Sequence, residues 1–287
     1  NVGAVAMTPL ILFLINQYGW RGAWFALGFI PWIVVVPPAL IWLRRQPEDM
    51  GLLPDGDTDE PSAPANPGGS QQPSARAPVV DEVSWTAREA FRTPALWLIL
   101  ASNIFTGMAI SGGIVHRIPY MTDLGFSDTV AGTTFVIYGV SAFFAKILWG
   151  LLADRYPIRW LAIAVLLGSA FGLSFIIEAG SLWDLYLGYG VVYGLTGGTL
   201  VVVGPLIWAN YFGRRYQGAI QGLTRPFGLF SSLGGPMFAA LVYDATKSYQ
   251  VAFSAFVGCF VIAAFFIWVA RPPVHPSVMA ATPTSHQ

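Results

Sequence analysis

Residues 133–159 read TTFVIYGVSAFFAKILWGLLADRYPIR, and this stretch decides the class of fold. At about 1.5 Å of rise per helical residue, residues 133–153 span roughly 30 Å, which matches the hydrocarbon core of a bilayer. One cation, Lys146, interrupts an otherwise uncharged run that ends at Ala153. The charged residues Asp154 and Arg155 come directly after this run. The pattern predicts a transmembrane helix that ends at a charged loop on one membrane face.

The composition of the whole chain agrees with this prediction. Only 10% of the 287 residues are charged, against about 25% in a typical soluble domain. Hydrophobic residues make up 55%, and the mean hydropathy is +0.59. We therefore expect an all-α polytopic membrane protein, a helical bundle with eight spans at 2–18, 23–43, 94–115, 129–152, 160–178, 183–209, 218–242 and 250–270.

The residue inventory argues against several functional classes. The chain shows no phosphate-binding loop, no cluster of metal ligands and no nucleophile–base set. The single cysteine, Cys259, lies in an apolar run, where a small packed side chain is expected. We expect no cofactor, no metal, no nucleic-acid partner and no enzymatic activity. Because the chain opens on Asn1 inside an apolar segment, we interpret it as a fragment without its N-terminal part.

The polar segment 44–93 separates the second and third spans. Its centre is rich in Pro, Gly, Ser and Asp, a composition that predicts a largely flexible linker. At its end, residues 84–93 mix polar and apolar side chains, with Ser84 near the start and Arg88–Phe91 after it. This pattern predicts a short amphipathic helix on the membrane surface. The polar tail 272–287 is expected to be disordered.

Basic residues are distributed unequally between the two sets of loops. One set holds Arg44, Arg45, Arg76, Arg88, Arg92, Arg155, Arg159, Arg214, Arg215 and Arg271, while the other holds only Arg21, Arg117 and Lys247. Since cytoplasmic loops carry the excess of Lys and Arg, the linker and the C-terminus are expected to be cytoplasmic. The expected location is the plasma (inner) membrane.

The segment GLLADRYPIR (150–159) resembles the cytoplasmic G-x-L-a-D-R-x-G-R-R loop of the major facilitator superfamily. It departs from that motif at Pro157, where the family has Gly, and at Ile158, where the family has Arg. Two spans before a long linker and six after it resemble helices five to twelve of that twelve-helix fold. The resemblance implies that 1–43 holds the last two helices of an N-terminal bundle, that 44–93 is the cytoplasmic linker, and that 94–271 is the six-helix C-terminal bundle.

The charged residues around this loop can be interpreted in two ways. The resemblance implies that Asp154, Arg155 and Arg159 latch helix ends in one state of a transport cycle. The alternative is that they only mark the topology of a solvated loop. The segment YFGRRYQGAIQG (211–222) resembles the link between helices ten and eleven, where Arg214 and Arg215 would contact lipid head groups.

Two cations, Lys146 and Arg225, fall near the middle of apolar spans. An ionised group in hydrocarbon costs several kcal/mol, so each is expected to face the protein interior or a wet cavity. The segment AKILWGLLADR resembles the eighth helix of the oxalate–formate and monocarboxylate branch, in which a cation binds the substrate carboxylate. Lys146 and Arg225 therefore either bind a substrate anion or form structural pairs. Tyr138 and Asn103 are further candidates for substrate binding.

Glycines suggest packing in some spans and bending in another. Small residues four apart let helices approach closely, which predicts packing faces at Gly190, Gly194, Gly198, Gly218 and Gly222. In the third span, Gly107, Gly112 and Gly113 predict a broken helix that bends as a gate, with His116 and Arg117 at its outer mouth. Alternatively, His116 and Arg117 are interfacial residues that cap the span. His116 is also a candidate proton carrier.

The combined prediction is a secondary transporter that works by alternating access. Its substrate would be a small organic anion, a mono- or dicarboxylate, moved by antiport or by proton symport across the lipid bilayer. An alternative is an efflux pump of the same superfamily for drugs or other hydrophobic compounds, which would need a carboxylate-rich cavity. An alternative of another class is a polytopic membrane enzyme or sensor.

Overall fold

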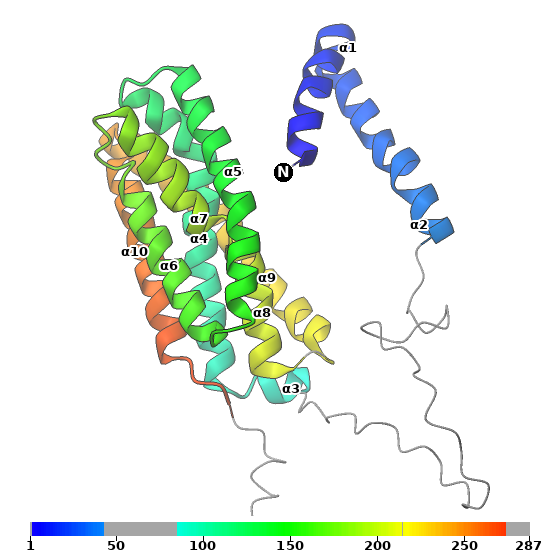
Figure 1. The fold of residues 1–287 in the computed structure, drawn as a ribbon, viewed down its shortest axis with the longest axis vertical. Helices are drawn as coiled ribbons and strands as arrows, with labels where there is room; N and C mark the ends of the chain where they lie inside the picture. Colours follow the sequence, from blue (N-terminus) through cyan, green and yellow to red (C-terminus); the bar gives the residue numbers. More distant parts are fainter. Residues whose placement is uncertain (1, 43–84, 214, 274–287) are drawn as a thin grey trace, which may run out of the picture. The chain divides into compact units, whose positions relative to one another are not determined.

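The computed structural model describes residues 2–42, 85–213 and 215–273, and every regular element in them is helical (Figure 1). The chain divides into two units, Asn1–Pro78 and Val79–Gln287. Six helices of the described part are long and apolar enough to cross a membrane. The protein is therefore an all-α polytopic membrane protein, as the composition indicates. The predicted linker 44–93 lies outside the described residues except for 85–93, and so does the tail from 274 onward.

The described part of the first unit holds two helices, α1 (Val2–Val34) and α2 (Val36–Trp42). The helical path of α1 is interrupted at Gly19, where φ is 68° and ψ is 172°. A residue with a Cβ adopts this positive φ only at a cost, so glycine suits the bend. The bend, visible in Figure 1, falls between the predicted spans 2–18 and 23–43.

The second unit is a helical bundle. It contains α3 (Ala87–Ala90), α4 (Pro94–Asp123), α5 (Asp128–Ala153), α6 (Ile158–Ser174), the π-helix η3 (Asp184–Tyr193), α7 (Gly194–Gly197), α8 (Leu200–Phe212), α9 (Gln217–Thr246) and α10 (Gln250–Val269). Side-chain N-caps mark the start of two of the long helices, α4 and α5. The side chains of Thr93 and Ser127 accept hydrogen bonds from backbone N–H groups of the first turns of α4 and α5.

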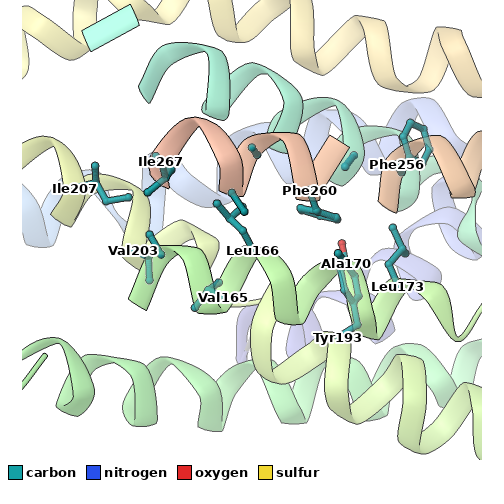
Figure 2. Packing of buried hydrophobic residues seen from close by; sticks show 14 of the residues in the cluster. Val165, Leu166, Ala170, Leu173, Tyr193, Val203, Ile207, Phe256, Phe260 and Ile267 are labelled. Carbon is teal, nitrogen blue, oxygen red and sulfur yellow. The ribbon is translucent and has the colours of Figure 1, made fainter. Parts of the chain in front are cut away.

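The core of this unit follows α10, which packs against both α4 and α6. Phe253, Phe256 and Phe260 on α10 are fully buried. Figure 2 shows Phe260 and Phe256 among Leu166, Leu173 and other side chains of α6 and α8. Large apolar side chains on the outside of α5 are exposed instead, among them Phe143, Phe144, Ile147, Leu148 and Leu151. An apolar exterior around an apolar core is the arrangement that a lipid environment requires.

The third predicted span is longer than expected and is continuous. α4 continues past residue 115 through His116, Arg117 and Pro119 to Asp123, so neither His116 nor Arg117 caps the helix. The predicted break at the glycines is wrong. Gly112 instead allows a close approach to α9, because a Cβ built there would lie 2.9 Å from the carbonyl oxygen of Gly235.

Other predicted spans differ at their boundaries. The predicted span 160–178 corresponds to the 17-residue α6, which ends at Ser174 and is shorter than the six candidate membrane helices. The predicted span 183–209 corresponds to one candidate membrane span, Asp184–Phe212, whose helical winding is irregular. It consists of η3, α7 and α8, with a turn at 198–199 before α8 begins at Leu200.

The second unit has two distinct ends. At the basic end, which comprises the described residues 85–93, 154–158, 213, 215–216 and 270–273, the hydroxyl of Tyr211 donates to the carbonyl of Ala270 at 2.8 Å. The backbone N–H of Trp85 also donates to the carbonyl of Phe212 there, at 3.0 Å. At the opposite end, which comprises 124–127, 175–183 and 247–249, the hydroxyl of Tyr120 donates to the carbonyl of Ile177 at 2.7 Å. The loops therefore alternate between the two ends.

Candidate functional site

A pocket of about 180 Å³ lies between α4, α8 and α9, and we call it the inner pocket. Its lining residues are Leu100, Asn103, Ile104, Trp208, Gln221, Thr224, Arg225, Gly228 and Ser231. Asn103 lies nine residues after the start of α4 and Arg225 eight after the start of α9. At about 1.5 Å per residue, both lie roughly 12–14 Å from the basic end, which is close to the depth of a bilayer midplane.

The periodicity of α9 explains how its polar side chains reach the pocket. Gln221, Thr224, Arg225, Gly228 and Ser231 are spaced at i, i+3, i+4, i+7 and i+10, which is one face of a helix. This face meets α4 and the end of α8, while the other sides of α9 carry exposed apolar residues such as Leu229, Phe230 and Leu233. The spacing is readable in the sequence, but charge alone singles out only Arg225 of this polar face.

The pocket contains unused hydrogen-bonding capacity. Ser231 is 3% exposed, and its Oγ has no hydrogen-bond partner in the described part of the chain. The neighbouring hydroxyl of Ser232 behaves differently, because it donates to the carbonyl of Gly228 at 3.0 Å. A buried hydroxyl without a partner costs about 1–3 kcal/mol, so it is unusual unless it serves a ligand or a water.

The pocket is also electropositive. Within the described ranges, Arg225 forms no ion pair with a carboxylate, and the lining contains no acidic residue. Guanidinium, amide N–H₂ and hydroxyl groups are all hydrogen-bond donors. Leu100, Ile104 and Trp208 provide the apolar part of the wall. This arrangement suits a small ligand with a negatively charged head and a short apolar body.

The structure brings together Asn103 and Arg225 but not the other predicted binding residues. Lys146 on α5 is half-buried and does not line the inner pocket. One turn after it, the indole Nε1 of Trp149 donates to the carbonyl of Leu195 at 2.8 Å, which ties α5 to α7. Tyr138 lies nearer the opposite end, where its ring stacks on Tyr193 at a centroid distance of 5.6 Å.

The predicted latch residues lie at the basic end. Asp154 is the C-cap of α5, and both it and Arg155 are exposed. Arg159 donates through Nε to the carbonyl of Ile267 at 3.3 Å and through a terminal nitrogen to the carbonyl of Trp268. These carbonyls belong to the last turn of α10, so the described contacts of Arg159 hold α6 to α10 within the second unit.

The predicted gate residues have different environments. The ring nitrogens of His116 lie 3.3 Å from the hydroxyl of Tyr249 and 3.1 Å from the carbonyl of Pro236, which links α4 to α9 and to the loop after it. Burial raises the pKa of Tyr249, so its hydroxyl stays protonated and is available as a donor to His116. Arg117 is buried at 8% exposure, although the sequence suggested an outer mouth.

The predicted packing glycines divide into two groups. A Cβ built on Gly194 would lie 2.7 Å from the Cβ of Ser141, and one on Gly190 would lie 2.9 Å from a methyl carbon of Ile137. Gly198 likewise faces Ala142. These three glycines therefore lie against α5. Gly218 and Gly222 have no atom within 4 Å of a built Cβ.

Comparison with known proteins adds to this geometry. Over 266 residues, the chain is 25% identical to monocarboxylate transporter 12 of Rattus norvegicus, covering 88% of this chain and 54% of that protein. It is 26% identical to monocarboxylate transporter 4 of the same organism, covering 86% of this chain and 49% of that protein. It is 24% identical to monocarboxylate transporter 11 of Homo sapiens, covering 96% of this chain and 55% of that protein. The chain thus spans about half the length of these relatives.

The family comparison covers the helices that form the inner pocket. The model of the Major Facilitator Superfamily matches residues 103–285, which begin at Asn103 and include α5 to α10. The match includes the loop 150–159 that suggested this family in the sequence. The chain belongs to the Major Facilitator Superfamily.

Proposed function

We propose that the protein to which this chain belongs is a secondary transporter for small organic monocarboxylates, which binds the carboxylate in the inner pocket. The observation that carries the proposal is the pocket itself. Arg225, Asn103 and Ser231 line one space that contains no acidic residue. In an apolar surrounding, such a set of donors favours an anion over a neutral or cationic ligand.

The size of the pocket favours a small anion over a drug. A volume of about 180 Å³ holds roughly six water molecules at about 30 Å³ each. Pockets for drug-sized ligands have volumes of about 300–1,000 Å³. A carboxylate with a few carbon atoms matches the inner pocket, and the named activity of the relatives, monocarboxylate transport, agrees with that size.

Alternating access is the mechanism that we infer from the family. In it, two helical bundles rock around a site near the midplane, and no covalent step occurs. Lys146 on α5 would supply a positive charge outside the inner pocket, while Asp154 and Arg155 would hold the basic end closed in one state. The excess of Arg at that end supports a cytoplasmic location for it. The coupling ion would be a proton or a counter-transported anion.

The test is uptake of labelled carboxylates into proteoliposomes that contain the full-length protein. The variants are Arg225→Gln and Lys146→Gln, with Arg225→Lys as the conservative change and Arg215→Gln as the control. Arg215 is exposed at the basic end and lies outside the pocket. A hydrogen bond to a charged group contributes about 1.5–3 kcal/mol, so Arg225→Gln should raise KM about 10- to 100-fold.

The outcomes are distinct. Uptake by the parent that falls in Arg225→Gln, recovers in part in Arg225→Lys and is unchanged in Arg215→Gln would support the proposal. If the parent moves neutral or hydrophobic compounds and no carboxylate, the efflux alternative is correct. Equal KM values in the parent, Arg225→Gln and Lys146→Gln would show that Arg225 and Lys146 do not bind the substrate.

A further inference from the structure

A second positive charge lies inside the same unit, far from the inner pocket. Arg117 on α4 is 8% exposed, and its Nε has no hydrogen-bond partner among the described residues. It lies fourteen residues beyond Asn103 along α4, which corresponds to about 21 Å of helix. Asp123, the last residue of the helix, follows six residues later, so Arg117 lies about 9 Å from the opposite end.

Aromatic rings surround the guanidinium. Its Cζ lies 4.2 Å from the ring centroid of Phe135 and 5.4 Å from that of Tyr138, both on α5. Tyr189 on η3 is close enough to interact electrostatically with Arg117. Tyr189 and Tyr193 stack on each other at 5.1 Å and on Tyr138 at 6.3 and 5.6 Å. The rings cover the guanidinium face and Tyr189 lies within hydrogen-bonding contact of the guanidinium, so the donor left without a partner among the described residues is Nε.

The charge of Arg117 is not balanced within the described ranges. The carboxylates at this end are exposed except for the half-buried Asp184, and none forms an ion pair with Arg117; they are Asp123, Asp128, Glu178, Asp184 and Asp244. Cation–π contact with the two rings replaces only part of the hydration that a guanidinium loses on burial, and it supplies no negative charge.

The backbone beside this charge is unusual. Tyr189 and Tyr193 are carried by η3, a ten-residue π-helix. π-Helical segments are rare, are less stable than α-helix, and occur frequently at functional sites. Gly188 and Gly190 within η3 are buried and let it lie against neighbouring helices. The uncompensated charge and the irregular helix therefore occur at the same place, on facing elements.

We infer that Arg117 forms a second anion-binding position, at which the carboxylate of the transported anion binds the guanidinium edge while Phe135 and Tyr138 hold the guanidinium plane. The inference rests on the proposed function and adds a separate site to it. The inner pocket lies on the side of the basic end, whereas Arg117, 8% exposed beside the rings of Phe135 and Tyr138, lies nearer the opposite end. The two positions thus serve the two faces of the membrane in turn, the inner pocket near the basic end and Arg117 near the opposite end.

The test compares the two membrane faces. Uptake of a labelled monocarboxylate is measured in right-side-out and inside-out vesicles that contain the full-length protein. Arg117→Gln should raise KM about tenfold or more at the face of the opposite end and less than about threefold at the face of the basic end. Arg225→Gln should show the reverse asymmetry. Arg117→Lys, which retains the charge but not the planar fork, should restore part of the affinity.

A second variant covers the case in which Arg117→Gln does not fold. Phe135 is 44% exposed, so Phe135→Leu removes the ring over the guanidinium without opening the core. It should raise KM several-fold at the face of the opposite end alone. Leu229→Ala, a change at an exposed apolar position on α9, is the control for general effects on packing.

A binding measurement separates this inference from the proposed transport activity. Monocarboxylate should raise the Tm of the purified full-length protein in detergent. In Arg117→Gln, the same concentration of monocarboxylate should raise the Tm by less. If this holds but the parent transports no carboxylate, the site stands and the proposed function fails. A purely structural role of Arg117, such as pairing with a carboxylate elsewhere in the protein, predicts a lower basal Tm with KM unchanged at both faces.

Three results would overturn the inference. The first is equal KM values at the two faces for Arg117→Gln or Phe135→Leu and the parent. The second is a Tm rise that is the same in Arg117→Gln and the parent. The third is a Tm rise that chloride produces as strongly as the carboxylate, which would identify an inorganic anion site instead.

Discussion

At the scale of single residues, Ser231 provides the sharpest test of the inner pocket. Its buried Oγ has no partner among the described residues, so Ser231→Ala removes an unsatisfied group without breaking a protein hydrogen bond. We expect the Tm to stay equal or to rise. If the hydroxyl donates to the bound carboxylate, KM should nevertheless increase about tenfold. Vesicle uptake and thermal unfolding measure the two effects separately.

The adjacent residue supplies the control for that experiment. Ser232 is exposed, and its hydroxyl donates to the carbonyl of Gly228, so Ser232→Ala should leave KM unchanged. A fall in Tm for Ser231→Ala together with unchanged KM would contradict a ligand-binding role. It would indicate that the hydroxyl satisfies a protein or water partner instead.

At the scale of elements, glycines determine how closely α5 approaches η3 and α7. Gly194→Ala would bring a Cβ to 2.7 Å from that of Ser141 and to 2.9 Å from the carbonyl oxygen of Tyr138. Overpacking of this kind costs about 1–3 kcal/mol. Gly222→Ala is the matched change on α9, where a Cβ meets no atom within 4 Å. Because alanine has the higher helix propensity, it should stabilise by up to about 1 kcal/mol.

Unfolding in mixed detergent measures both changes. Gly194→Ala should lower the free energy of unfolding, and Gly222→Ala should leave it equal or higher. Destabilisation by Gly222→Ala of the same size as by Gly194→Ala would mean that α9 packs on a part of the protein outside the described residues. That result would place Gly222 among the packing residues, as its spacing in the sequence suggests.

The same elements show what hydropathy and spacing predict and what they do not. Length and apolarity located the helices, because crossing a bilayer constrains both. Glycine is ambiguous, since it serves bending and close approach alike. The spacing of the glycines therefore predicts a bend at Gly112, whereas α4 is one continuous helix there. Likewise, Arg225 was recognisable by its charge, but Gln221 and Ser231 become informative only once α4 and α8 are known to face them.

At the scale of the whole molecule, the arrangement of charge predicts orientation. Arg155, Arg215 and Arg271 lie at the basic end of the second unit, and the opposite end carries Asp128, Glu178 and Asp184. Positively charged loops remain in the cytoplasm during membrane insertion. The basic end should therefore face the cytoplasm in the full-length protein, which also decides which membrane face Arg117 and the inner pocket serve.

Cysteine labelling in intact cells checks this orientation. In a full-length background without other reactive cysteines, Cys259→Ser is combined with Gly180→Cys at the opposite end or Tyr156→Cys at the basic end. Both positions are exposed, and a Cβ at Gly180 meets no atom within 4 Å. A membrane-impermeant maleimide should label position 180 in intact cells and position 156 only after permeabilisation. The reverse pattern would invert the assignment of faces, so Arg117 would then bind the anion from the cytoplasm and Arg225 from outside.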